Sequence, residues 1–326
     1  GIRAWYQDML PGGVEDGELS GLLEKIPWHF AANILRAAAW VSGKKNFYPV
    51  LITAFKCAPD SFIIEYFKQL MDLSDKPYLI IQIDEHDSNV GYETRIEAAL
   101  RSFRNHARNS TRGSMHDPGS LLPRVETRLD GKVLLMPNWD TFVSPLVVAN
   151  LRRAGTDARL LETSELSIRK SMAYNTGQCL PINIIAQDYM DYLECHDLDP
   201  SRTILWMMEG RVSCNLRQYP FFIKRILENN GNGLEKACVY SGEISHREMP
   251  VSVTYYAYFA YMLGGLFRKT ACRIRPSGRC TGSFSEPYPG KRLLKARSGM
   301  VCSLWTRSNT TNRAANPWSP SSEISM

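Results

Sequence analysis

The stretch Tyr48–Phe55 reads YPVLITAF, an apolar run rich in β-branched residues, and it decides how the rest of the sequence is interpreted. An apolar run of this length bounded by polar segments predicts a buried strand. The amphipathic segment Asp60–Leu73 predicts the helix after it, and the run YLIIQI at Tyr78–Ile83 predicts a second strand, with another helix at about Tyr92–His106. Strands that alternate with helices in this way indicate parallel βαβ units.

The same alternation resumes in the second half of the chain. The predicted strands are Lys132–Met136, Asp157–Leu161, Thr203–Met208 and Lys236–Tyr240, and the predicted helices are Ser144–Ala154, Cys179–Leu193 and Arg217–Leu227. We therefore expect an α/β fold with two Rossmann-like lobes, each a parallel sheet flanked by helices. Right-handed crossovers would bring the loops after successive strands to one edge of each sheet, where ligands bind in such folds.

Changes in composition predict five segments. They are a truncated helical lead-in at 1–46, a first α/β lobe at 47–106, a linker at 107–130, a second lobe at 131–275, and an irregular tail at 276–326. The tail is rich in Ser, Thr, Arg, Gly and Pro, so we expect either a disordered extension or a frame-shifted or chimeric end, and assign it no function. The chain begins at Gly1 without Met, so we expect it to be a fragment of a longer protein.

Charge and composition exclude several classes of protein. The chain has 326 residues, 44% of them hydrophobic, which is typical of a globular protein and not of a disordered one. Its net charge is +6, but the tail alone contributes +5, from seven basic and two acidic residues, so the body carries only +1. A nearly neutral body offers no excess of positive charge to bind the phosphate backbone of a nucleic acid. No apolar run reaches the length of a membrane helix and no signal peptide is visible, so we expect a cytoplasmic protein.

Three of the eight cysteines occupy positions that favour chemistry. Cys57 and Cys214 each lie between a predicted strand and the next helix, and Cys179 stands at the start of a helix. Helix N-termini favour the thiolate form and anionic ligands. Three converging thiolates could hold an iron-sulfur cluster with one iron left open to water or substrate. The alternative is that each is a small buried hydrophobe, which is a common role of cysteine.

The other cysteines give less support for a metal site. No C-x-x-C pair exists, so zinc fingers and ribbons have no local support. Cys195, Cys238 and Cys272 are interpreted as core or surface residues, and Cys280 and Cys302 are discounted with the tail.

Candidate catalytic residues follow the second predicted strand. Glu85 and His86 could act as a general base or a metal ligand, or could cap the next helix. Arg95 could belong to a charged helix face or meet a phosphate or the carboxylate of an acyl-CoA. Asn138 and Asp140 follow the third strand at an equivalent place. There is no G-x-x-x-x-G-K-[ST] or G-x-G-x-x-G motif, so we expect no ATP site in this chain.

Several long motifs resemble a known family. They are ITAFKCAPDSFIIEYF at Ile52–Phe67, KPYLIIQIDEHDSNVGYETRIEA at Lys76–Ala98, LLMPNWD at Leu134–Asp140, YNTGQCLPINIIAQ at Tyr174–Gln187, and the segment around Cys214. Together they resemble the 2-hydroxyglutaryl-CoA dehydratase-like region of the large 2-hydroxyacyl-CoA dehydratase activases, the BadF/BcrA-type group. The resemblance covers roughly Phe47–Arg275.

The resemblance implies anaerobic electron transfer. In that family an ATP-hydrolysing activase passes a low-potential electron to a dehydratase-like component, whose cysteines bind a 4Fe-4S or double-cubane cluster and which reduces an acceptor such as a 2-hydroxyacyl-CoA. Cys57 matches the cysteine of the family's K-C-x-P-D-S-F motif, Cys179 that of T-G-Q-C-x-P, and Cys214 the cysteine after the later strand. The activase's nucleotide-binding domains are absent from the sequence, and so are cysteines expected upstream of Gly1.

These observations lead to one expectation and two alternatives. We expect an iron-sulfur electron-transfer component whose partners are an ATP-dependent activase domain or subunit, an acyl-CoA or another small acceptor, and a second copy of the chain in a homodimer. Neither nucleic acid nor a membrane is expected as a partner. One alternative is a non-catalytic module that docks to or regulates the activase. The other is a mononuclear zinc enzyme that uses the three thiolates and a water.

Overall fold

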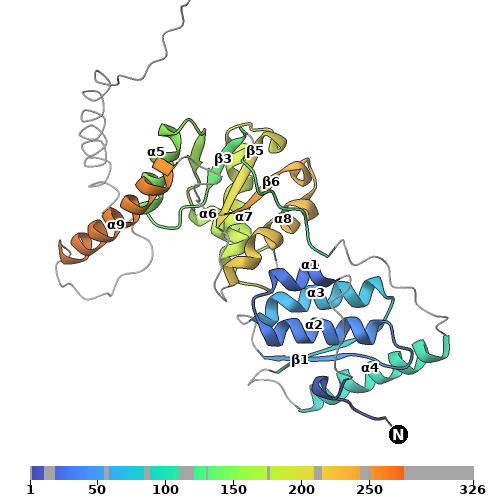
Figure 1. Ribbon diagram of the computed structural model, residues 1–326. Coiled ribbons are helices and arrows are strands. Elements are labelled where there is room, and N and C mark those ends of the chain that lie inside the picture. Colours follow the sequence, from blue (N-terminus) through green and yellow to red (C-terminus); the bar gives the residue numbers. More distant parts are fainter. Residues whose placement is uncertain are drawn as a thin grey trace, which may run out of the picture. The chain divides into compact units, whose positions relative to one another are not determined.

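The computed structural model of the protein describes residues 2–10, 19–54, 59–83, 89–109, 121–129, 131–174, 177–208, 215–242 and 251–274. The chain divides into two compact units, Gly1–Thr270 and Ala271–Met326. Of the second unit only residues 271–274 are described, so the predicted irregular tail lies outside the described residues. Both α/β lobes belong to the first unit (Figure 1).

The first lobe is a short parallel sheet covered by helices (Figure 1). Strands β1 (Val50–Ala54) and β2 (Leu79–Ile83) pair in parallel, with Ile52 opposite Ile81. The helices are α1 (Ser20–Lys25), α2 (His29–Ser42), α3 (Pro59–Leu73) and α4 (Asn89–Asn109), and a short 3-10 helix, η1 (Gln7–Met9), precedes them. In β1 burial alternates along the strand, which is the period of two expected when one face of a sheet packs on a core.

Helix α3 illustrates why these residues fold locally as they do. Pro59 is its first residue, where the missing N–H costs no hydrogen bond, and Asp60 places a negative charge at the positive end of the helix. Its apolar residues recur every three or four positions and form one buried face: Phe62, Ile63, Tyr66, Phe67, Leu70 and Met71.

The second lobe is a four-stranded, all-parallel sheet in the order β4-β3-β5-β6 (Figure 1). The strands are β3 (Val133–Met136), β4 (Ala158–Leu160), β5 (Thr203–Met208) and β6 (Cys238–Gly242). The helices are α5 (Val143–Arg153), α6 (Glu165–Ser171), α7 (Leu180–Cys195), α8 (Tyr219–Asn230) and α9 (Val251–Ile274), with 3-10 turns η4 (Pro200–Arg202), η5 (Asn215–Gln218) and η6 (Leu234–Lys236).

The strand order reverses between β3 and β5. The chain moves from β3 outward to β4, and then returns to the other side of β3 to form β5 and β6. In open parallel sheets this reversal opens a crevice at the carboxyl ends of the two strands, which is where such folds bind ligands. The predicted α/β fold with parallel sheets flanked by helices is confirmed.

Several local details differ from the sequence prediction. Helix α6 was not predicted; it is held by a reciprocal cap in which the Ser164 hydroxyl accepts from the Ser167 N–H and the Ser167 hydroxyl accepts from the Ser164 N–H. The predicted helix Arg217–Leu227 begins at Tyr219 instead, because residues 215–218 form the tighter turn η5.

Residues 121–129, which fall in the predicted linker, run alongside β6. The Glu126 N–H donates to the Val239 carbonyl at 2.8 Å, and the Ser241 N–H donates to the Glu126 carbonyl at 2.9 Å. These two bonds place Val125 and Thr127 next to the carboxyl end of β6.

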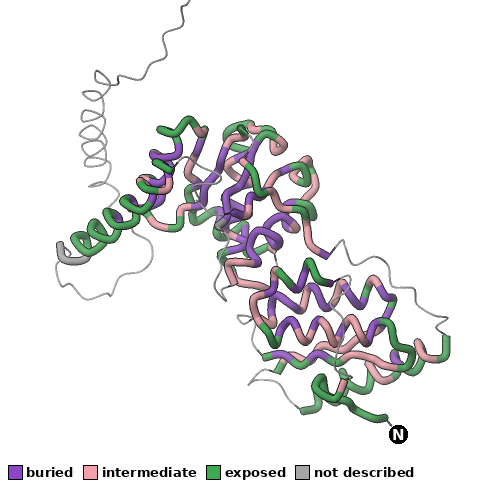
Figure 2. Tube along the Cα trace, viewed as in Figure 1, coloured by how far each residue is buried: buried purple, intermediate pink, exposed green. Residues whose placement is uncertain are grey.

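Aromatic rings join α3 to α8 in the main core. Phe62 is fully buried and packs edge-to-face on Phe222 with ring centroids 5.2 Å apart, and it stacks on Tyr219 at 6.5 Å. Trp28 covers a further side of Phe62 at 6.0 Å. Figure 2 shows buried positions in α2, in α3 and in the second sheet. The helical lead-in and both sheets therefore share one core cluster.

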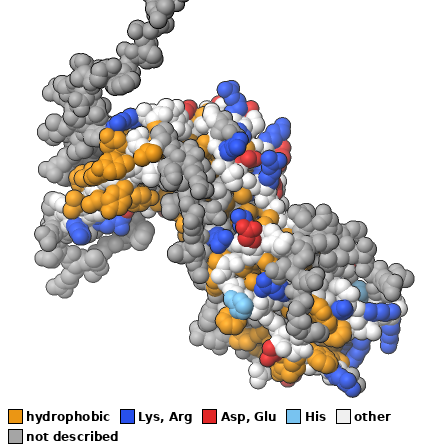
Figure 3. Space-filling view, viewed as in Figure 1, with side chains coloured by type: hydrophobic (Ala, Val, Ile, Leu, Met, Phe, Trp, Pro, Cys, Tyr) orange, Lys and Arg blue, Asp and Glu red, His pale blue; other side chains and the backbone are white. Residues whose placement is uncertain are grey.

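Helix α9 buries small residues and exposes large ones. Val253, Ala257 and Ala260 are buried, and the Asn150 amide donates to the Val253 carbonyl at 2.8 Å. The large side chains lie outside: Tyr255, Tyr258, Phe259, Tyr261, Met262, Leu263, Leu266 and Phe267. Figure 3 shows them as a hydrophobic surface over α9. Helix α9 therefore packs on the protein through its small-residue side.

Candidate functional site

The candidate site is built around Cys179, the residue immediately before helix α7. Its backbone is extended, its carbonyl accepts from the Ile182 N–H at 3.1 Å, and Pro181 occupies the first turn. The side chain is half-buried and packs against the main core. The cysteine therefore stands at the helix N-terminus that the sequence predicted, with its sulfur held against the protein.

A side chain from the chain after β5 contacts the sulfur of Cys179. The amide nitrogen Nδ2 of Asn215, the first residue of η5, lies 3.8 Å from Cys179 Sγ and donates to it. The two residues are 36 positions apart in the sequence. An N–H directed at a thiolate stabilises its negative charge, and hydrogen bonds to sulfur tune metal sites that use such ligands.

The residue before Cys179 contacts the first turn of α3. Gln178 donates from Nε2 to the carbonyl of Ser61 at 3.1 Å, across 117 positions of sequence. Ser61 is itself buried, so this contact belongs to the interior. The other amide atom of Gln178, Oε1, is also buried and has no hydrogen-bond partner within the described ranges. An unpaired buried acceptor is uncommon in folded proteins and calls for an explanation.

Three distant segments therefore meet at one place: the start of α3, residues 178–179, and the start of η5. The packing of Phe62 on Tyr219 and Phe222 holds the start of α3 against the chain that follows η5. A second buried link reinforces this packing, because the Tyr66 hydroxyl donates to Gln218 Oε1 at 3.0 Å and Gln218 Nε2 donates to the Lys25 carbonyl at 2.6 Å. Burial raises the pKa of Tyr66, so its hydroxyl stays a neutral donor.

Several residues selected from the sequence lie outside the described residues: Cys57, Glu85, His86 and Cys214. Arg95 is described; it is exposed on α4. Of the three cysteines predicted to bind a cluster, the structure thus describes Cys179 alone. In the described part of the chain, no three His, Cys, Asp or Glu side chains gather closely enough to hold a metal ion.

Asp140, which follows β3, serves the fold. Asp140 Oδ1 accepts from the backbone N–H groups of Phe142 at 2.8 Å and Val143 at 3.0 Å, and so caps the start of α5. The same carboxylate forms an ion pair with Arg268 of α9. Cys195 is exposed at the end of α7, and Cys238 is half-buried with the Lys132 ammonium 2.7 Å from its sulfur. Of the two roles that the sequence allowed for Cys195, core or surface, the structure shows the surface one.

Comparison with protein-family models, with curated proteins and with solved structures finds no match for this chain. None of the helices within the described ranges is both long and apolar enough to cross a membrane.

Proposed function

We propose that this chain is the iron-sulfur electron-transfer component of a system that resembles the 2-hydroxyacyl-CoA dehydratases and works with an ATP-dependent activase. The proposal rests on the resemblance of the motifs around Cys57, Cys179 and Cys214. One structural observation supports it: described residues from the same three motifs contact one another. Gln178 contacts Ser61, which follows Cys57 by four positions, and Asn215 contacts Cys179.

Chain connectivity links these contacts to the thiols. Cys214 is bonded directly to Asn215, and Cys57 precedes Pro59, the first residue of α3, by two positions. Consecutive Cα atoms lie about 3.8 Å apart, so the chain allows both thiols to reach the neighbourhood of Cys179. Three separate pockets for the three cysteines would have argued against a shared ligand set. The contacts from Gln178 to Ser61 and from Asn215 to Cys179 favour a shared ligand set.

The donor set fits an iron-sulfur cluster chemically. Thiolates are the usual ligands of such clusters, and a bound cluster would supply one-electron transfer at low potential. The protein's own contribution would be to bury Cys179 against the core and to direct the Asn215 N–H at its sulfur. An acyl-CoA or another small acceptor would bind at the carboxyl ends of β3 and β5, where open parallel sheets with this strand order bind their ligands.

Anaerobic reconstitution of the full chain with iron and sulfide tests the proposal. We expect the chain to retain both elements in similar amounts and to give an EPR signal after reduction. Replacing Cys57, Cys179 or Cys214 with Ser should abolish or greatly weaken retention. Cys195→Ser is the matched control because that thiol is exposed at the far end of α7, and it should leave retention unchanged. A chain that retains no iron, or that retains zinc in preference, would refute the cluster.

A second candidate function is a docking or regulatory module of the activase. The exposed aromatic face of α9 favours it, because contiguous apolar surface of this kind often marks a binding surface. Under this alternative the three cysteines are structural, and their Ser variants should leave the partner's ATPase activity and its stimulation unchanged. Loss of cluster together with loss of electron transfer would decide against it.

A further inference from the structure

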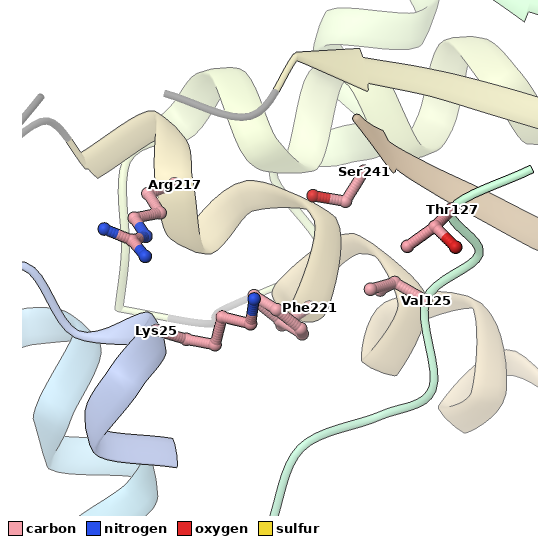
Figure 4. Close-up of a pocket in the computed structure, with 6 residues that line it drawn as sticks. All are labelled: Lys25, Val125, Thr127, Arg217, Phe221 and Ser241. Carbon is pink, nitrogen blue, oxygen red and sulfur yellow. The ribbon is translucent and has the colours of Figure 1, made fainter. Parts of the chain in front are cut away.

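The cavity of about 60 Å³ lined by residues of α1, the 121–129 segment, η5, α8 and β6 offers no converging set of ligand groups. Figure 4 shows the Arg217 guanidinium and the Thr127 hydroxyl at opposite ends of the lining, both directed away from it. A ligand site needs a few polar groups that converge on the bound molecule. Apolar surface gathers instead on α9, as Figure 3 shows.

Helix α9 carries apolar residues on two opposite sides. The inner side consists of small residues at intervals of three or four positions: Val253, Ala257, Ala260 and Gly264. The outer side consists of large residues half a turn away around the helix: Val251, Tyr255, Tyr258, Phe259, Met262 and Leu266. These six residues form what we call the α9 stripe. One buried side suffices to attach a surface helix to its protein, so the exposed stripe is additional apolar surface.

Contacts with α5 fix the direction in which the α9 stripe faces. The Asn150 amide donates to a carbonyl in the first turn of α9 at 2.8 Å, and a Cβ added to Gly264 would overlap the Val143 side chain. Near the other end of α9, Arg268 forms an ion pair with Asp140. Because these contacts hold the inner side along most of the helix, α9 cannot rotate to bury the stripe.

The spacing of the α9 stripe reads the same in both directions along the helix. Successive stripe residues are 4, 3, 1, 3 and 4 positions apart, and the midpoint falls between Tyr258 and Phe259. In a two-fold symmetric pair each surface meets its own copy, so residue i contacts residue j and j contacts i. Two antiparallel copies of α9 that cross at this midpoint therefore match along the whole stripe. The facing pairs are Tyr258 with Phe259, Tyr255 with Met262, and Val251 with Leu266.

These facing pairs are chemically compatible. Tyr258 with Phe259 joins two aromatic rings, and Tyr255 with Met262 joins a ring to a thioether, which are both favourable contacts. Residues 251–267 include no charged side chain, so two copies of the stripe bring no like charges together. Within one chain the rings of Tyr255 and Phe259 already pack edge-to-face with centroids 4.8 Å apart. This order lowers the entropy that pairing costs.

The exposed area of α9 is large enough for a stable dimer. An aromatic side chain covers about 150–250 Å², so the exposed fractions of the stripe and of the flanking Tyr261, Leu263 and Phe267 present roughly 500–900 Å². The largest apolar patch on a typical monomer is about 300–600 Å². Two copies that pair through this face would bury roughly 1,000–1,800 Å², which overlaps the range of specific, stable interfaces.

We propose that the α9 stripe pairs with the α9 stripe of a second copy of the chain, antiparallel across a two-fold axis. The sequence led us to expect a second copy as a partner without indicating a surface, and α9 supplies that surface. This inference goes beyond the proposed electron-transfer function and does not depend on a cluster. A stripe occupied by a second copy is not available to the activase, so the dimer also counts against the docking alternative.

Light scattering and analytical ultracentrifugation of the full chain over a dilution series test the dimer. We expect a reversible equilibrium between monomer and dimer. Tyr258→Glu should raise the dissociation constant roughly 100-fold or more, because the dimer would bury two unpaired charges. Tyr258→Phe keeps the ring and should change the dissociation constant by less than about twofold.

Leu166→Glu is the matched control for the introduced charge. Leu166 lies on α6 and is exposed to 61%, close to the 64% of Tyr258, but it lies outside the stripe. This variant should dimerise as the wild type does. Because both side chains are exposed in the single chain, circular dichroism should show that both variants fold.

A pair of variants tests the antiparallel register. Tyr255→Lys and Met262→Glu should each weaken the dimer when studied alone, because each buries an unpaired charge. An equal mixture of the two should form a heterodimer, since the antiparallel register places the introduced lysine of one chain against the introduced glutamate of the other. A parallel pair would place position 255 against position 255 and would not restore pairing.

Three results would overturn the inference: a wild-type chain that stays monomeric at every concentration, a dimer that Tyr258→Glu and Tyr255→Lys leave intact, and a mixture that does not pair. Binding of a monomeric wild type to phosphatidylcholine vesicles, lost in Tyr258→Glu, would identify a lipid surface as the occupant instead. Iron and sulfide retention is measured separately. A dimer without a cluster, or a cluster in a monomer, therefore distinguishes failure of the proposed function from failure of this inference.

Discussion

The buried hydrogen bond between Tyr66 and Gln218 gives a direct test of how α3 is held to the second lobe. Both side chains are fully buried, the Tyr66 hydroxyl lies 3.0 Å from Gln218 Oε1, and Gln218 also donates to the Lys25 carbonyl. Gln218→Leu replaces the amide side chain by an apolar one of similar size and leaves the tyrosine hydroxyl without an acceptor. Tyr66→Phe removes the hydroxyl and leaves the amide oxygen without its donor.

The magnitude follows from these losses. A buried donor left unsatisfied costs about 1–3 kcal/mol, and the lost bond to the Lys25 carbonyl adds about 1 kcal/mol, so Gln218→Leu should destabilise the fold by about 2–4 kcal/mol. For a domain of this size that lowers Tm by roughly 5–15 °C. Tyr66→Phe should cost less, about 1–2 kcal/mol, because the Gln218 amide keeps its other bond.

Urea unfolding of the wild type, both single variants and the double variant measures the coupling. We expect the double variant to be destabilised by about 1–2 kcal/mol less than the sum of the singles, because each single change strands the other partner. Tyr258→Phe removes an exposed hydroxyl and should change stability by less than about 0.5 kcal/mol. If the single effects add to within about 0.3 kcal/mol, the two side chains are not coupled and our account of this core is wrong.

Three further predictions concern Lys76, Asp188 and Asp140. Burial lowers the pKa of Lys76 from 10.5 to about 8, so the folded state loses this proton at a lower pH than the unfolded state does. The free energy of unfolding of the wild type, relative to that of Lys76→Met, should therefore rise by about 2 kcal/mol between pH 7 and pH 9.5. Urea unfolding that gives the same difference between the two proteins at both pH values would contradict this. Burial raises the pKa of Asp188, whose carboxylate accepts from the Thr163 hydroxyl at 2.6 Å, so burial penalises its ionised form. The change Asp188→Asn should therefore be more favourable for stability at pH 7 than at pH 3, which thermal melts at both pH values would show. Asp140→Ala should cost about 0.5–2 kcal/mol by removing the cap of α5, whereas Asp140→Asn, which retains a capping oxygen, should recover most of that loss in the same melts.

Much of the fold was determined by the sequence itself. The apolar runs at Val50–Ala54 and Thr203–Met208 are strands because short, β-branched or buried runs bounded by polar turns have few other stable conformations. The period of three to four residues after Pro59 and after Cys179 determined α3 and α7, and with them the place of Cys179 at a helix start. These features are local, so a local pattern suffices to find them.

Only the tertiary structure decided which distant residues meet. The order β4-β3-β5-β6, the contacts from Gln178 to Ser61 and from Asn215 to Cys179, and the cavity shared by Lys25 and Arg217 all join segments far apart in the chain. Hydrophobic periodicity reports which face of an element is buried, but not against what, because burial is non-directional and any complementary apolar face can satisfy it. The choice among partners comes from close packing of particular shapes, such as Phe62 between Trp28 and Phe222, and that packing exists only in the complete fold.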